Sequence, residues 1–132
     1  HVLQDLHRKV RAVRIRIMNQ CKHPKITNEL DIKAKHNQDA REKIHSYNKK
    51  DLNYYLLKKF DWLLYLNHQS RKSVLDLNKE KKMNRRLQRY CNYNDLLNLI
   101  LNIDEDLKEA YYFLIRVDMF FRESTLETAK KT

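Results

Sequence analysis

The chain has no glycine among its 132 residues and a single proline, Pro24. Glycine is the residue that most readily adopts a positive φ, so glycine-rich phosphate loops and many tight turns are largely excluded. This composition argues against a β-sandwich, a P-loop fold and a dinucleotide-binding fold. Apolar residues instead recur at helical spacing. We therefore expect residues 1–132 to form one all-α domain, a bundle of about five to six helices.

The first helix is predicted over residues 1–21. Its apolar residues share one face, and basic residues cover the rest of its circumference. That apolar face comprises Val2, Leu3, Leu6, Val10, Val13 and Ile17. Because it is well formed from the first residue, we expect the chain to be part of something longer, and we interpret residues 123–132 as a frayed or truncated end.

Three further segments are predicted between residues 27 and 90. Thr27 or Asn28 caps a sparse, mostly polar second helix that ends before Asp51. A third helix over residues 51–67 is apolar on nearly all sides, which is typical of a central helix. After a connection over residues 68–76, the pattern predicts a strongly basic helix over residues 77–90.

Two capped helices complete the prediction. Asn92 or Asn94 is expected to cap a short apolar helix, and Asp104 to cap the last one. Glu105 and Asp106 then lie in the first turn, where the helix dipole favours negative charge. Capping also explains this acidic run better than a divalent-metal site does.

The net charge of +11 is concentrated in residues 1–92, which hold 23 Lys and Arg against 9 Asp and Glu. Residues 93–132 hold 5 against 8. A basic body indicates a polyanionic partner, most often nucleic acid. A compositional bias toward lysine explains the charge equally well. The candidate DNA-binding residues are Arg8, Arg11, Arg14, Lys82, Arg85, Arg86 and Arg89.

No catalytic or metal site is predicted. The Cys21-x-His23 spacing is too short for a zinc site and has no second pair of ligands. Cys21 and Cys91 give no disulfide framework and are typical of reduced cytosolic thiols, so we expect a cytoplasmic protein. No segment approaches 18 consecutive apolar residues, and no membrane partner is expected. The aromatic residues of the third helix are interpreted as core rather than as a base-stacking platform.

Three segments in order resemble DDE-type transposases of bacterial insertion sequences, in particular the ISL-three type family. The first resembles the family's segment that follows a catalytic strand, and residues 22–50 match poorly. The matching positions are His1, Gln4, Arg8, Arg14 and Met18, then Leu56–Leu64, then Tyr93–Asp104 with Leu107–Tyr112.

The resemblance implies a parent enzyme with an RNase H-like fold, in which three carboxylates bind two Mg²⁺ ions for DNA transposition by phosphoryl transfer. In that family the second catalytic Asp precedes the residue matched by His1, and the catalytic Glu lies in a glycine-containing segment. This chain therefore carries no catalytic residue. It would form the helical region between those carboxylates, contact the DNA of transposon ends and target, and belong to a parent that acts as a homodimer.

Two other hypotheses remain open. The chain could be a stand-alone basic helical protein that binds nucleic acid, or a structural helical protein with no nucleic-acid role. The salt dependence of DNA binding separates these two, because phosphate contacts release counterions.

Overall fold

The computed structural model describes residues 2–66 and 77–131, with side chains described up to Ser124. These residues are mostly helical and include five α-helices and one small two-stranded sheet, so the predicted all-α class is confirmed. The elements are α1 (Val2–Gln20), α2 (Asn28–Ala34), α3 (Gln38–Lys59), the 3₁₀-helix η1 (Asp61–Tyr65), β1 (Lys82–Asn84), β2 (Arg89–Cys91), α5 (Tyr93–Leu101) and α6 (Glu105–Lys131).

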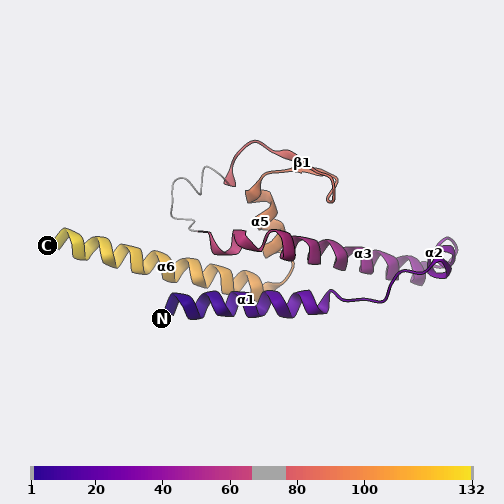
Figure 1. The fold of residues 1–132 in the computed structure, drawn as a ribbon, viewed down its shortest axis with the longest axis horizontal. Helices are drawn as coiled ribbons and strands as arrows, with labels where there is room; N and C mark the ends of the chain where they lie inside the picture. The colour runs from indigo at the N-terminus through magenta and orange to yellow at the C-terminus, as the bar shows by residue number, and fades with distance from the viewer. Residues whose placement is uncertain (1, 67–76, 132) are drawn as a thin grey trace.

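Three long helices run along the longest axis of the molecule (Figure 1). Helix α6 packs along α1, and α3 lies between this pair and the part of the chain that holds α5 and the hairpin. Helix α2 folds back against the N-terminal end of α3. The C-terminal half of α6 extends beyond the start of α1 (Figure 1).

One hydrophobic core joins these elements. Val10 and Ile17 of α1 are buried and Leu3, Leu6 and Val13 pack against the core, so the apolar face predicted for this helix is confirmed except at Val2, which is 53% exposed. Leu107, Tyr111 and Leu114 of α6 are also buried. The segment predicted to be central is also buried, through Leu56, Leu57, Phe60, Leu63 and Leu64. Burial of these leucine side chains supplies most of the driving force for packing.

Side chains cap most of the helix starts. The Thr27 hydroxyl accepts from the Leu30 N–H at 3.2 Å at the start of α2. Asn92 and Asp95 form a reciprocal capping box at the start of α5. Asp104 accepts from the Asp106 and Leu107 N–H groups at the start of α6, which confirms its predicted role as a cap.

The predicted boundary at Asp51 is wrong, because α3 continues from Gln38 to Lys59 without a break. Asn37 caps this helix, with its side chain accepting from two N–H groups of the first turn. The change from polar to apolar residues near Asp51 is therefore not a helix end. It marks the point where one continuous helix enters the core, since Ala40 is the only buried residue of its first half.

The predicted basic helix over residues 77–90 is also wrong. Strands β1 and β2 pair antiparallel, with Met83 opposite Tyr90. The Asn84 side chain closes the turn by accepting from the Leu87 N–H at 2.9 Å, and Gln88 takes a positive φ of 57°. The turn is therefore formed without glycine, by the Asn84 side chain and by Gln88 in a conformation that is uncommon for residues other than glycine. The predicted connection over residues 68–76 lies outside the described residues.

Candidate nucleic-acid interface

The hairpin β1–β2 contacts α3 through its turn, and its strand β2 contacts α5. Alternate residues of a strand point to opposite faces, so Asn84 and the buried Cys91 share the inner face. The Asn84 amide donates to the Tyr55 hydroxyl at 3.5 Å. The Arg86 guanidinium lies over the Tyr55 ring, 5.4 Å from its centre. These contacts hold the turn of the hairpin beside the C-terminal part of α3.

A cleft of about 470 Å³ opens where the hairpin meets α3. Its walls are the rings of Tyr54 and Tyr55, and its cations are Lys58, Lys59 and Arg86. The Lys58 ammonium lies 5.7 Å from the Tyr54 ring centre, and the Lys59 ammonium lies 5.5 Å from that of Tyr55. Each lysine follows its tyrosine by four residues, which places the two side chains on one helix face.

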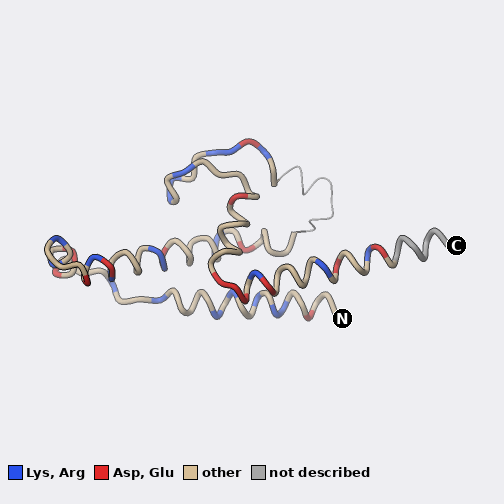
Figure 2. Tube along the Cα trace, turned by 180° about the vertical axis from the view of Figure 1, so that it is seen from behind, with Lys and Arg blue, Asp and Glu red and all other residues tan. Residues whose placement is uncertain are grey.

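We give the name basic hairpin surface to the three cations that line this cleft together with the other three predicted DNA-binding residues of the hairpin: Lys58, Lys59, Lys82, Arg85, Arg86 and Arg89. All six are exposed. Figure 2 shows Lys and Arg positions in blue along α3 and the hairpin. Four of the six were predicted as DNA-binding residues from the sequence. Lys58 and Lys59 were not, although their four-residue spacing from adjacent tyrosines is visible in the sequence.

The carboxylates near the basic hairpin surface form their ion pairs with residues outside it. No Asp or Glu of the described residues forms an ion pair with any of its six cations. Asp51 lies at the rim of the cleft, but its carboxylate is bound to His23, with the Nε2 and Oδ1 atoms 2.6 Å apart. Lys81 pairs with Asp95 at 3.3 Å next to the hairpin. The Asn92 N–H and Lys81 together lower the pKa of the Asp95 carboxyl.

The three arginines predicted on α1 lie away from this surface, on the other side of α3 (Figures 1 and 2). Arg8 is exposed and lies 3.6 Å from Asp5. The Arg11 guanidinium lies 5.7 Å from the Tyr65 ring centre. Arg14 is half-buried and donates to the Leu57 carbonyl at 3.1 Å, which favours a structural role. The structure therefore separates the predicted DNA-binding residues into two groups, one on the hairpin and one on α1.

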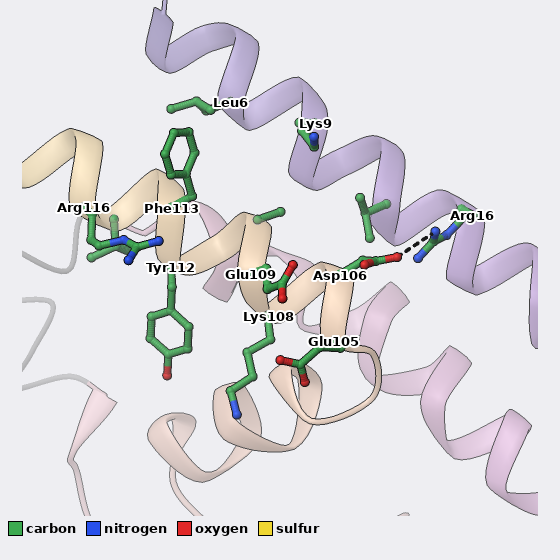
Figure 3. A pocket seen from close by; sticks show the side chains of 13 residues that line it. Leu6, Lys9, Arg16, Glu105, Asp106, Lys108, Glu109, Tyr112, Phe113 and Arg116 are labelled. Carbon is green, nitrogen blue, oxygen red and sulfur yellow. Dashed lines mark hydrogen bonds and ion pairs between the residues drawn. The ribbon is translucent and has the colours of Figure 1, made fainter.

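A second, larger hollow of about 1150 Å³ lies between α1 and α6 (Figure 3). Phe113 points toward Leu6 of α1, whereas Tyr112 points away from α1. Charges of both signs line the hollow, and Arg16 pairs with Asp106 at 3.1 Å. A mixed lining of this kind does not favour a polyanion.

The acidic run at the start of α6 is accounted for by capping and ion pairs. Asp104 caps the helix, and Arg16 binds both Asp104 and Asp106. Within the described ranges, no group of three or more His, Cys, Asp and Glu side chains is arranged to hold a metal ion. Nor is any helix there long and apolar enough to cross a membrane.

Comparisons of the chain with protein-family models, with curated proteins and with solved structures gave no significant match. The function must therefore be argued from the residues and their geometry.

Proposed function

We propose that this protein binds DNA through its sugar–phosphate backbone, with the basic hairpin surface as the contact area. The observation that carries the proposal is the meeting of Lys58 and Lys59 of α3 with Arg86 of the hairpin turn at one cleft, beside three more exposed cations of the hairpin. None of these six cations forms an ion pair with a carboxylate of the described residues. Lysine and arginine bound to phosphates release condensed counterions, which gives affinity with little dependence on sequence.

The geometry also distinguishes two groups of cations within this surface: those held against aromatic rings and those along the hairpin. Arg86 is held over the Tyr55 ring, and Lys59 lies over the same ring and that of Phe60. Contacts of this kind limit the motion of long side chains, so less conformational entropy is lost when a phosphate binds. Lys82, Arg85 and Arg89 extend the cationic track along the hairpin.

The test compares two double variants that remove equal charge. Arg85→Ala with Arg86→Ala removes two cations of the basic hairpin surface, and Arg8→Ala with Arg11→Ala removes two from α1. Binding of a labelled duplex is measured by fluorescence anisotropy over a series of salt concentrations. Each phosphate contact contributes about −0.9 to the slope of log K against log salt.

We expect the hairpin variant to weaken duplex binding and to reduce the steepness of the slope by about 2. The α1 variant should leave both quantities close to those of the parent protein. A parent slope near zero would exclude phosphate contact. An α1 variant that loses as much affinity as the hairpin variant would remove the assignment of the surface.

A narrower proposal is that the chain is a segment of an insertion-sequence transposase of the ISL-three type. Its support is the order of the three sequence segments that resemble that family. The segment would then support the catalytic domain and contact DNA in the bacterial cytoplasm, at the nucleoid, within a parent enzyme that uses Mg²⁺ and acts as a homodimer. The flanking codons test this directly. An Asp-x-Phe segment just upstream and an Asn-Gly-x-x-Glu segment downstream are expected, and their absence would leave a stand-alone DNA-binding protein.

A further inference from the structure

The outer face of the hairpin carries two large apolar side chains that point away from the core. Met83 and Tyr90 lie directly opposite each other in the register of the two strands. They are 48% and 62% exposed. Because Asn84 and Cys91 occupy the inner face, Met83 and Tyr90 must occupy the outer one. We call this pair the hairpin platform.

The Tyr90 ring differs from the other exposed aromatic rings near it. Trp62 and Tyr93 contact each other edge to face, with their ring centres 5.0 Å apart. Tyr54 lies under the Lys58 ammonium. Tyr90, by contrast, makes no ring or cation contact with any residue that the structure describes. The exposed part of its ring is therefore accessible to a ligand from the outer side of the hairpin.

Charge identifies the class of that ligand. The platform lies on the same hairpin as Lys82, Arg85, Arg86 and Arg89. By the register, Lys82 and Arg89 share the face of Asn84 and Cys91, and Arg85 and Arg86 lie in the turn, so the cations lie beside and behind the platform. An apolar peptide gains nothing from these cations, whereas a polyanion with planar aromatic groups matches both the charge of the hairpin and its exposed ring. An unpaired nucleic-acid strand has that chemistry, because its bases expose their faces while its phosphates follow a basic track. In a duplex the faces of the bases are stacked inside the helix.

We propose that bases of a single DNA strand stack on the hairpin platform, with Tyr90 as the main contact, so that this protein prefers single-stranded to duplex DNA. The inference rests on the proposed function, since the basic hairpin surface supplies the phosphate contacts. Base stacking on an aromatic side chain changes affinity by about fivefold to a hundredfold per base and is tolerant of sequence.

The test measures the binding of labelled oligo-dT, alone and annealed to oligo-dA of equal length, at one moderate salt concentration. Tyr90→Thr removes the ring but keeps a residue that favours β-strands. Tyr90→Phe keeps the ring and loses the hydroxyl. Tyr112→Ala serves as the matched control, because Tyr112 is 45% exposed on α6, outside the basic hairpin surface. Thermal melting of each variant establishes that it is folded.

We expect Tyr90→Thr to weaken oligo-dT binding by about fivefold or more while duplex binding stays unchanged. Tyr90→Phe and Tyr112→Ala should bind both probes like the parent protein. Unchanged oligo-dT affinity in Tyr90→Thr would overturn the stacking inference, as would equal losses on both probes. If Tyr90→Thr does not fold, the parent protein decides. A parent protein that binds the duplex as tightly as oligo-dT contradicts the proposal.

The two proposals fail separately. If Arg85→Ala with Arg86→Ala weakens binding of both probes but Tyr90→Thr has no selective effect, the stacking inference fails and the proposed function stands. If the arginine variant has no effect on either probe, the proposed function fails with it.

Discussion

Replacing Arg14 by alanine should destabilise the protein and leave DNA binding by the folded form unchanged. The Arg14 side chain is 15% exposed and bridges α1 to the end of α3. Its Nη1 atom donates to the Leu57 carbonyl oxygen at 3.1 Å and lies 3.0 Å from the Met18 sulfur. Leu57 belongs to the last turn of α3, where the Leu56 carbonyl accepts from the Phe60 N–H and the following carbonyls lie beyond the regular helix ladder. Arg14 therefore caps α3 from a different helix.

The contacts of Arg14 allow its contribution to stability to be estimated. A hydrogen bond to a charged donor is worth about 1.5–3 kcal/mol when the acceptor is shielded from water. The Nη2 atom lies 3.8 Å from the carboxylate of Asp61, which is 36% exposed, so that ion pair adds at most about 1 kcal/mol. The Nε N–H is buried and has no partner within the described part of the chain, which offsets some of the gain. We expect a net loss of about 2 kcal/mol.

Urea unfolding followed by far-UV circular dichroism measures this loss. Arg8→Ala is the matched control, because it removes the same charge from an exposed position on the same helix and should change stability by about 0.5 kcal/mol or less. Duplex affinity is then measured on the folded Arg14→Ala protein. A variant that is as stable as the parent protein but binds duplex more weakly would refute the structural role and return Arg14 to the DNA-binding residues.

Two more predictions concern the core and the loop after α1. Leu63→Ala should lower the free energy of unfolding by about 2–5 kcal/mol, because Leu63 is completely buried; a loss below about 0.5 kcal/mol in a denaturant titration would contradict its place in the core. His23 hydrogen-bonds to Asp51 through Nε2 and to the Pro24 carbonyl through Nδ1, and these two acceptors raise the pKa of His23. Stability from this contact is complete below the unfolded-state pKa of about 6.5 and is lost as the pH rises through the higher folded-state pKa. The thermal midpoint of the parent protein should therefore fall over that range relative to His23→Gln, and parallel pH profiles would show that the contact contributes nothing.

The elements that could be predicted from the sequence are those determined by neighbouring residues. The apolar face of α1 repeats at helical spacing, so it is visible without any knowledge of its partner α6. The caps Thr27, Asn92 and Asp104 act on N–H groups within three residues of themselves. Local hydrogen bonds of this kind leave a signature in the sequence.

The hairpin could not be predicted, because its structure depends on contacts distant in the chain. Its inner face is defined by packing against Tyr55, 29 residues before Asn84. Its turn needs a positive φ at Gln88, a residue that rarely takes that conformation, so the lack of glycine was misleading there. The position of Lys58 and Lys59 at the cleft could not be predicted for the same reason. Only the folded hairpin shows that these lysines border a cleft rather than a bare helix surface.

The error about the hairpin changes the expected DNA partner more than it changes the expected charge. In a helix, Lys82, Arg85, Arg86 and Arg89 would also lie on one face, because they follow the i, i+3, i+4, i+7 spacing. Such a helix is a shape that fits the major groove of a duplex. The observed ribbon instead contacts α3 through its turn, where Arg86 lies over the Tyr55 ring, and presents Met83 and Tyr90 on the face opposite to Asn84 and Cys91. Lys82 and Arg89 then share the face of Asn84 and Cys91, and Met83 and Tyr90 occupy the opposite face, where we propose that unpaired bases stack. A two-stranded ribbon can also enter the major groove, so it is the selective loss of oligo-dT affinity expected for Tyr90→Thr that distinguishes base stacking from binding in a groove.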